Sequence, residues 1–417
     1  MVDILNTAIS ALQTYRRALD TTSHNVANVG TEGYSRQRVD QSTLLPQQYG
    51  YGFVGSGVGI NGITRSYDEF TALQYRSTSS SLSREEVFAS LANRINNLYA
   101  DSTTGLSATL QQFANAVQSV ASAPSSMSAR QSLLTEANSL ASQMSSYAQS
   151  LEQIDAEVNG RLTSAVADIN SISSSIADLN GRIAIAYGST GKSPNDLLDQ
   201  RDLLLDQLSE KIGISTVAME DGTVNVLVGS GQALVIGVDA MRLYTQPDRY
   251  DGSRLSIVAG LPAGPVDVTR NLTGGELGGV LDFRNKMLDP SRNALGQLAV
   301  GIAGLVNGQQ AEGMDLDGLA GTDVFRLGGV GVLPGAGNSG TASIAVTRGD
   351  PTQVTRSNYL LEYNGSNWSL QQPIAAPPGR YDAGMVYDSA RQRVVLHGGN
   401  GHNAQYLSDT WEWDGSV

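Results

Sequence analysis

Histidine is the commonest general base and metal ligand in proteins, and this chain of 417 residues contains only three. His397 and His402 are five residues apart across a glycine-rich segment, and Asp382 could complete a three-ligand metal site. Their spacing fits no established zinc-ligand pattern, so we interpret both as structural residues beside a β turn. His24 lies in a predicted helix with no catalytic partner nearby. We therefore predict no catalytic residue and no metal ligand.

Four aspartates recur at helical spacing on one side of a predicted helix: Asp196, Asp199, Asp202 and Asp206. Paired carboxylates can perform acid–base chemistry. The default interpretation is a solvated helix face that is partly compensated by Arg201 and Lys211. This interpretation assigns the aspartates no chemical role.

Three loop motifs look like ligand sites but lack the context that such sites need. Two of them have the dinucleotide-binding spacing, Gly50-x-Gly52-x-x-Gly55 and Gly57-x-Gly59-x-x-Gly62. That site requires a strand before the glycines and a helix directly after them, and residues 46–49 are no buried strand. The third motif, Asp315-x-Asp317-Gly318, begins like a calcium loop but lacks the later bidentate glutamate. We interpret all three as turns and predict no cofactor.

The composition excludes several classes of protein. There are 40 acidic and 27 basic residues, giving a net charge of -13, which argues against binding nucleic acid or anionic lipid. The absence of cysteine excludes disulfides, thiolate nucleophiles and zinc–thiolate sites. No secretory signal and no apolar run long enough to span a membrane are visible. These tests predict a soluble cytoplasmic chain, but they would miss export that reads an uncleaved N-terminus.

A first helix is predicted over residues 4–27 from an apolar stripe with heptad character. The stripe comprises Leu5, Ala8, Leu12, Tyr15, Leu19, Thr22 and Val26. Such a narrow stripe needs a partner, because an isolated helix gains little from it. The partner is either the helix's own domain or a coiled-coil helix, and the spacing alone leaves both open.

The pattern from residue 69 to 187 is overwhelmingly helical. Its clearest part is a heptad run with one stutter between residues 140 and 183, equivalent to a rod of roughly 65 Å. Apolar residues at 91–98 and 106–120 supply partner helices, with a break at Ala123-Pro124-Ser125-Ser126. This pattern predicts a long helical bundle or coiled coil rather than a compact enzyme fold.

Other segments differ in period and composition. Residues 28–68 are rich in glycine and predict loop or irregular β structure, while 223–228 and 233–236 predict strands. The predicted modules are an axial helix with a signature segment (1–68), a helical bundle (69–212), a β-rich domain (213–275), return helices of the bundle (276–312), a partial outer β domain (313–372) and a separate C-terminal module (373–417).

One segment carries a specific resemblance. It follows the first helix and contains Asn25, Asn28, Thr31, Gly33, Tyr34, Ser35, Arg36 and Gln37. This segment resembles the signature of flagellar rod, hook and hook-associated proteins. Its Gly-Tyr-Ser-Arg-Gln ending resembles the hook-associated protein 1 family of the hook–filament junction. Further similar stretches, including 195–202 and 274–284, extend the resemblance over about residues 1–370.

The resemblance implies a structural subunit of the extracellular flagellum, exported unfolded by the flagellar type III apparatus without a cleaved signal. Leu5, Leu12 and Leu19 on the first helix, together with the signature residues, would serve assembly. The implied partners are further copies of the chain, the hook protein and the second junction protein. An export chaperone is also implied, although we expect its C-terminal site to be missing. No enzyme activity, cofactor, nucleic acid or membrane is implied.

The C-terminal module departs from this resemblance. A heptad helix is expected at the end of such proteins, whereas residues 379–415 resemble a kelch repeat, which forms one propeller blade. Propellers need about four or more blades, so a lone blade should be loosely ordered. The predicted fold class is thus α+β multidomain, a long helical bundle or coiled coil with β-rich insertions and a β-propeller-blade fragment.

The C-terminal module also leaves alternatives open. The chain could be a surface protein or fusion that presents a kelch-type binding module on a flagellar-like stalk, with Tyr406, Trp411 and Trp413 stacking on a ligand. A copper oxidase of the kelch kind is a remote alternative, because only one blade and two nearby histidines are available.

Overall fold

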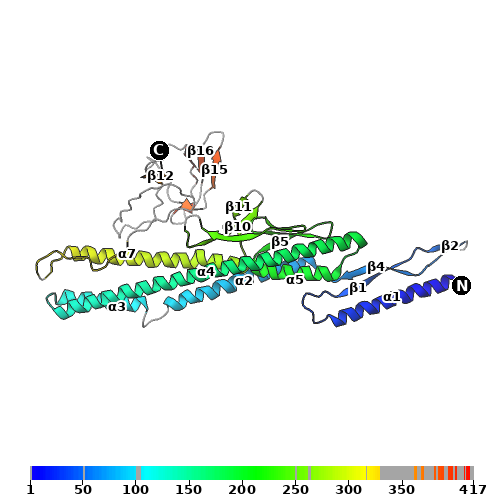
Figure 1. The fold of residues 1–417 in the computed structure, drawn as a ribbon, viewed down its shortest axis with the longest axis horizontal. Helices are drawn as coiled ribbons and strands as arrows, with labels where there is room; N and C mark the ends of the chain where they lie inside the picture. Colours follow the sequence, from blue (N-terminus) through cyan, green and yellow to red (C-terminus); the bar gives the residue numbers. More distant parts are fainter. Residues whose placement is uncertain are drawn as a thin grey trace. The chain divides into compact units, whose positions relative to one another are not determined.

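We describe a computed structural model of the chain, which defines residues 2–49, 52–99, 105–248, 251–261, 264–315 and 317–328 and short strands between residues 361 and 413. The described residues up to 328 form one compact unit, and the strands from 361 onward belong to a second unit. Figure 1 shows the helices and strands of both units along the sequence.

The first unit begins with an arm, residues 2–65, in which one helix lies beside two paired strands (Figure 1). Helix α1 (Val2–Ala27) packs on β1 (Gln37–Thr43) and β4 (Val58–Arg65), which pair antiparallel with a bulge. The turn between them carries the short hairpin of β2 (Gln47–Tyr49) and β3 (Gly52–Val54). The segment 28–68, expected as loop or irregular β structure, is therefore largely a paired ribbon.

Small side chains determine which face of α1 meets this ribbon. Thr14 and Thr21 are buried, and both donate side-chain hydrogen bonds back to carbonyls four residues earlier in the helix. Threonine and alanine let the strands approach the helix axis closely. The large apolar residues of α1 lie elsewhere on the helix and are exposed.

Long helices form the body of the unit and lie roughly along one direction (Figure 1). They are α2 (Glu69–Tyr99), α3 (Leu106–Ser122), α4 (Met127–Thr190), α5 (Asn195–Lys211), α6 (Gly275–Phe283) and α7 (Asp289–Ala311). The predicted break is confirmed, because Ser126 caps α4 by accepting the Ala129 N–H. With 64 residues, α4 is about 96 Å long at 1.5 Å per residue, longer than the predicted run.

The return helices predicted over residues 276–312 are α6 and α7, and a π-helical turn, Arg284–Leu288, joins them. A π turn inserts one extra residue into a helix and changes the facing of everything after it. The spacing of apolar residues in the sequence does not predict this π turn.

A β-rich layer covers one side of α4. It has a four-stranded sheet in the order β5-β6-β7-β8 and a three-stranded sheet in the order β11-β10-β9. Their strands are β5 (Ile214–Ala218), β6 (Val224–Val228), β7 (Gln232–Ile236), β8 (Asp239–Ala240), β9 (Leu243–Pro247), β10 (Leu255–Leu261) and β11 (Gly264–Asp267). Strands β6 and β7 confirm the two predicted from alternation.

Two asparagines of α4 hold this layer by its backbone. Asn170 accepts the Leu243 N–H and donates to the Leu243 carbonyl, at 2.9 and 2.8 Å. Asn180, fully buried, donates to the carbonyls of Val224 and Gly237. A buried amide that satisfies strand backbone groups fixes the register of helix against sheet.

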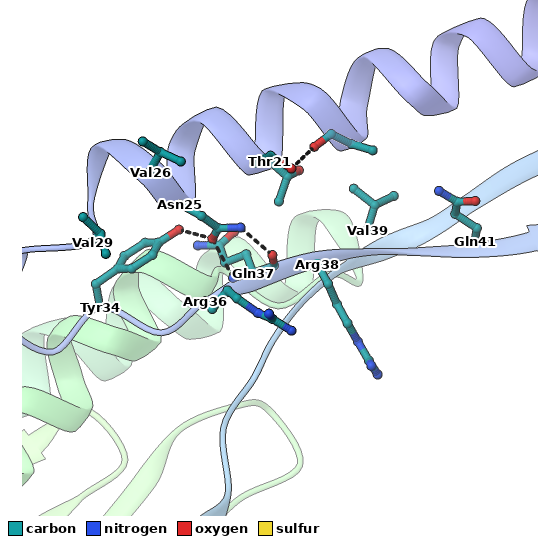
Figure 2. A pocket seen from close by; sticks show the side chains of 12 residues that line it. Thr21, Asn25, Val26, Val29, Tyr34, Arg36, Gln37, Arg38, Val39 and Gln41 are labelled. Atoms are coloured by element: carbon teal, nitrogen blue, oxygen red, sulfur yellow. Dashed lines mark hydrogen bonds between the residues drawn. The ribbon is translucent and has the colours of Figure 1, made fainter.

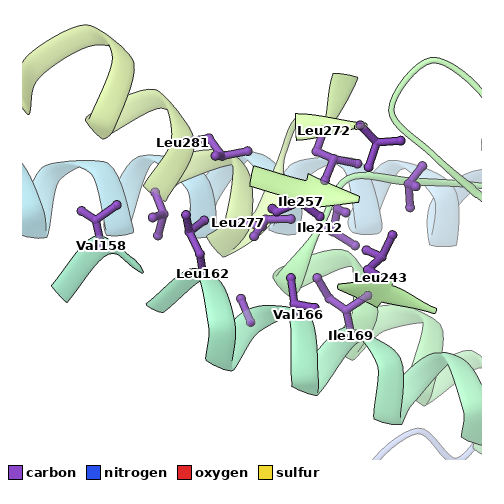
Figure 3. Packing of buried hydrophobic residues seen from close by; sticks show 14 of the residues in the cluster. Val158, Leu162, Val166, Ile169, Ile212, Leu243, Ile257, Leu272, Leu277 and Leu281 are labelled. Atoms are coloured by element: carbon purple, nitrogen blue, oxygen red, sulfur yellow. The ribbon is translucent and has the colours of Figure 1, made fainter. Parts of the chain in front are cut away.

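The heptad run of α4 forms the spine of the main core (Figure 3). Val158, Leu162 and Ile169 are fully buried and belong to one cluster with residues of β9, β10 and α6. The period therefore reflects burial of α4 against helices on one side and strands on the other. A smaller cluster around Phe113 and Leu140 joins α3, α4 and α7.

The second unit contains short antiparallel pairs. β12 (Leu361–Tyr363) pairs with β13 (Trp368–Leu370), and β14 (Arg380–Tyr381) with β17 (Asn400–Gly401). A three-stranded sheet has the order β15-β16-β18, formed by Gly384–Asp388, Arg393–His397 and Thr410–Trp413.

A glycine contact between α2 and α6 gives a test of this packing. A Cβ at Gly279 would lie 2.4 Å from the Arg84 carbonyl oxygen, whereas one at Gly296 in α7 would meet nothing within 4 Å. We expect Gly279→Ala to lower the free energy of unfolding by about 1–3 kcal/mol, the cost of overpacking. Gly296→Ala should raise it by roughly 0.5–1 kcal/mol. Urea unfolding measures both, and equal stabilisation by both variants would contradict the close helix contact.

Candidate assembly site of the N-terminal arm

The side chain of Asn25 clasps the start of β1 (Figure 2). Its Oδ1 accepts the Gln37 N–H and the Tyr34 hydroxyl, each at 2.8 Å, and its Nδ2 donates to the Gln37 carbonyl at 2.8 Å. By bonding both the N–H and the C=O of Gln37, the Asn25 amide takes the place of a neighbouring strand residue at the start of β1. It therefore fixes the chain reversal between α1 and β1.

The rest of the signature builds that reversal. Asn28 Nδ2 donates to the His24 carbonyl at 3.0 Å, and Thr31 Oγ1 donates to Asn28 Oδ1 at 3.3 Å. Gly33 has φ +77°, and a Cβ there would lie 3.0 Å from the Leu203 Cβ. Glycine is needed both for this backbone conformation and for the close approach to α5.

Two carboxylates of α5 receive the signature segment. Asp199 Oδ2 accepts the Ser35 N–H at 2.9 Å, and Asp196 Oδ1 accepts from Gln37 Nε2 at 2.8 Å. Asn195 adds a bond from its Nδ2 to the Ile63 carbonyl of β4. The arm is thus attached to α5 at both of its long strands.

Arginines complete a ladder along the same face of α5. Arg65 of β4 pairs with Asp199 at 3.0 Å and with Asp202 at 2.5 Å. Arg76 of α2 pairs with Asp202 at 3.3 Å and with Asp206 at 2.6 Å. The Arg76 and Asp199 side chains are each 6% exposed.

The expectation of a solvated aspartate face holds for Asp196 alone, whose side chain is 64% exposed, and is wrong for the rest of the face. Its partners are Arg65 and Arg76 rather than Arg201 and Lys211. Arg201 instead donates to the Gly222 carbonyl at 2.7 Å, and Lys211 pairs with Glu276. The helical spacing of the four aspartates was a signal of a shared face, but their partners lie far away in the sequence.

The electrostatics of the ion pairs along α5 favour a structural role for these aspartates over a role in proton transfer. Burial raises the pKa of Asp206, against the opposing effect of Arg76. Burial likewise raises the pKa of Tyr34, and the charges of Asp196 and Asp199 add to the increase. Each aspartate of the ladder accepts a hydrogen bond or pairs with a cation of the chain itself, which is the arrangement of a structural joint.

The apolar stripe of α1 remains uncovered. Leu5 is 62% exposed, and Leu12 and Leu19 are 70% exposed. The strands of the arm cover the small face of the helix, so the stripe has no partner among the described residues. Arg36 is also exposed and makes no ion pair there. Of the predicted assembly residues, the leucines and Arg36 face outward, while the other signature residues build the joint.

A groove of about 730 Å³ lies between α1 and the start of β1 (Figure 2). Its apolar lining includes Ala18, Val26, Val29, Tyr34 and Val39. Arg36 and Arg38 flank it on the strand with side chains directed away from α1 (Figure 2). No acidic residue is among its lining residues.

The remaining chemical candidates have structural partners. His24 lies edge-on to Tyr34, with its Nε2 3.6 Å from Asp196. His397 Nδ1 lies 2.8 Å from the Thr410 hydroxyl, whereas Asp382 and His402 lie outside the described residues. Asp315 Oδ1 accepts the N–H groups of Asp317 and Leu319, as in a tight turn.

The described residues of the other candidate motifs form no ligand site. The described glycines of the two dinucleotide-like motifs lie in or beside β3 and β4, with no helix directly after them. Within the described part of the chain no group of three or more possible metal ligands occurs, and no helix is long and apolar enough to cross a membrane.

Removing the Asn25 clasp should loosen the signature segment. Asn25→Ala leaves the buried backbone groups of Gln37 unpaired, so we expect the local opening free energy of residues 34–39 to fall by about 2 kcal/mol. Amide hydrogen exchange measures this opening. Asn6→Ala, an exposed position on the same helix, is the control, and equal exchange in both variants would contradict the clasp.

Two family profiles match the chain. A profile described as the flagellar hook-associated protein FlgK helical domain covers residues 92–325, and one described as the flagella basal body rod protein covers residues 5–34. The latter contains most of α1 and most of the signature segment. The former contains most of the helical body and the β-rich layer.

Known proteins agree with these profiles. Flagellar hook-associated protein 1 of Salmonella typhimurium is 35% identical over 378 residues, which cover 89% of this chain and 68% of that protein. The Bacillus subtilis protein of the same name is 29% identical over 239 residues, covering 53% of this chain and 47% of that protein. The solved flagellar hook junction protein FlgK of Burkholderia pseudomallei has a TM-score of 0.63 and 32% identity, covering 82% of this chain and 56% of that one. The chain thus spans little more than half the length of that solved relative.

The signature joint, the rod-protein match and the long bundle together define a structural protein of the bacterial flagellum. Within that class, the chain belongs to the flagellar hook-associated protein 1 family. It is therefore a hook-associated component of the extracellular flagellum.

Proposed function

We propose that the chain is a structural subunit that joins hook to filament and polymerises through its N-terminal arm. The observation that carries this proposal is the exposed leucine stripe of α1. The helix uses its small residues for its own strands and leaves Leu5, Leu12 and Leu19 in solvent. An exposed apolar stripe along a helix is typical of a surface that is buried on assembly.

The joint between arm and body supports a mechanical role. The guanidinium group of Arg65 pairs with the largely buried carboxylates of Asp199 and Asp202 and holds the arm on α5. Arg76 of α2 holds the body to the same face of α5. Leu5, Leu12, Leu19 and Arg36 would make the contacts between subunits, and the signature residues of the joint would transmit load to the bundle. In this proposal the chain has no catalytic activity.

In this proposal the partners are those that the family resemblance implies. The hook protein would lie on one side of the junction and the second junction protein on the other, with export through the flagellar type III apparatus. An export chaperone would accompany the chain before export. The bundle would act as a coiled-coil-like rod with the β domains outside, following the module boundaries predicted from the sequence.

The second unit supports a second candidate function. Its three-stranded antiparallel sheet aligns Trp411 opposite Leu396 and Trp413 opposite Val394, an arrangement compatible with part of a kelch-type blade. In this alternative the flagellar body presents a binding module at the cell surface.

Complementation tests the main proposal. The full chain would be produced in a bacterium that lacks its own hook-associated protein 1, and sheared flagella would be analysed by immunoblotting. We expect the chain in the hook–filament fraction, with a cytoplasmic marker excluding lysis. Retention of the chain inside cells, with no chain in the flagellar fraction, would contradict the proposal.

A further inference from the structure

A cleft of about 350 Å³ lies in the body of the first unit, between α2, the beginning of β5, the β6–β7 turn and the segment directly before α6. Its volume is at the lower end of the range for small-molecule sites, about 300–1,000 Å³. Two guanidinium groups and six hydroxyl groups line it, and no acidic residue is among its described lining residues. The hydroxyl groups belong to Ser77, Ser80, Ser81, Ser215, Thr216 and Thr273.

The hydroxyl group of Ser80 has no partner in the described part of the chain. Ser80 is 6% exposed, and its Oγ is buried without a hydrogen bond. The neighbouring Ser81, by contrast, donates to the Ser77 carbonyl one turn earlier in α2. Buried side-chain hydroxyls are nearly always hydrogen-bonded, so Ser80 indicates a ligand group that enters the cleft.

The Ser80 hydroxyl is directed across the cleft at the start of α6. A Cβ on Gly274 would lie 2.6 Å from Ser80 Oγ, so these two lining residues are close neighbours. Gly274 has φ +72° and is the residue before α6, with no side chain to cap the helix. The first N–H groups of a helix have no partner within the helix, and their partial positive charge favours an anion. An anionic acceptor beside Gly274 would therefore satisfy both the helix and Ser80.

Arg76 and Arg84 lie one helical turn before and one turn after Ser80. A spacing of four residues places all three on one face of α2, with about 6 Å along the axis between neighbours. The carboxylates that pair with the two arginines are not among the lining residues of the cleft. They are Asp202 and Asp206 for Arg76, and Asp282 for Arg84. These carboxylates orient the guanidinium groups and partly neutralise them, so we expect an anion to bind weakly.

We propose that this cleft binds a tetrahedral oxyanion, phosphate or sulfate, either as the free ion or as a group of a small molecule. The Ser80 hydroxyl donates to one oxygen, and the N-terminus of α6 faces the anion. Arg84, whose side chain is 36% exposed, supplies a charged donor, which makes the stronger class of hydrogen bond. The site lies outside the arm and goes beyond the proposed function, because it would connect α2, β5 and α6 within one subunit.

Ser80→Ala tests the site, because it removes the proposed donor and keeps a good helix former in α2. Inorganic phosphate would be titrated into the purified full chain by calorimetry at constant ionic strength. We expect saturable binding with a Kd on the order of 1 mM. Ser80→Ala should raise this Kd roughly tenfold, because a hydrogen bond to a charged group is lost. Chloride in place of phosphate should give no saturable signal.

Ser173→Ala is the matched control. Ser173 lies on α4 and is fully buried with an unpaired hydroxyl, like Ser80, but it does not line the cleft. Without phosphate, neither variant should be less stable than the parent chain, because each removes an unsatisfied buried hydroxyl. Phosphate should then raise the melting temperature of the parent chain and of Ser173→Ala, and much less that of Ser80→Ala.

The same titrations can overturn the proposal. Absence of saturable phosphate binding would do so, and so would equal phosphate affinity of the parent chain and Ser80→Ala. An equal rise in melting temperature for all three chains would indicate a general salt effect instead of a site. Arg84→Gln, which removes the charge, should also weaken binding, and unchanged affinity would contradict its role.

Glycerol 3-phosphate distinguishes the two sources of the oxyanion. Tighter binding of glycerol 3-phosphate than of inorganic phosphate would support a phosphate group carried by a small molecule. Equal or weaker binding would support the free ion. In both cases Ser80→Ala should weaken binding by the same factor, because the hydroxyl contacts the phosphate group itself, and a loss confined to one ligand would contradict that contact.

Discussion

Replacing Arg76 by alanine should lower the free energy of unfolding by about 3–5 kcal/mol, because it leaves the partly buried Asp206 without a cation and leaves Asp202 with Arg65 alone. Arg76 is 5% exposed and joins α2 to Asp202 and Asp206 of α5. Burial already raises the pKa of Asp206 with Arg76 present, so its charged form is poorly tolerated without the guanidinium. Urea unfolding monitored by circular dichroism measures the loss.

Arg182→Ala is the matched control, because Arg182 is exposed on α4 and has no ion pair within the described residues. Its effect should stay within about 0.5 kcal/mol. An Arg76→Ala protein as stable as the control would show that the ladder contributes little. Arg76→Lys separates charge from geometry, since lysine cannot reproduce the two-sided contact of the guanidinium and should recover only part of the stability.

The sequence predicted which segments form amphipathic helices better than it predicted what those helices pack against. The heptad stripe of α1 and the run in α4 repeat locally, so the helices follow from spacing alone. The face of α1 that packs on β1 and β4 was not predicted, because it contains Thr14 and Thr21, which are not apolar residues. The π turn after Phe283 likewise has no sequence period.

The candidate site shows the same division. The signature residues were found by resemblance, and the aspartates of α5 by their helical spacing. Their pairing was missed because Arg76 and Asp206 are 130 residues apart. A helix face of carboxylates looks identical in sequence whether water or arginine neutralises it, and only the packing of α2 and β4 on α5 decides between them.

Placing charges on the α1 stripe should abolish assembly without unfolding the subunit. In the double variant Leu12→Glu/Leu19→Glu, both altered positions are 70% exposed in the isolated chain, so the free energy of unfolding should change by less than about 0.5 kcal/mol. Burial of two leucines in an interface contributes roughly 4 kcal/mol, equivalent to about a thousandfold in affinity. Incorporation into sheared flagella should therefore be lost.

Ile185→Glu provides the control, because it adds a charge at an exposed apolar position outside the arm and should leave incorporation unchanged. Normal incorporation of the double variant would show that the stripe stays in solvent in the flagellum. Loss of incorporation together with a lowered urea midpoint would instead place the stripe within the fold of the subunit. Only loss with unchanged unfolding identifies the leucines as an assembly surface, because an interface residue affects the polymer and not the monomer.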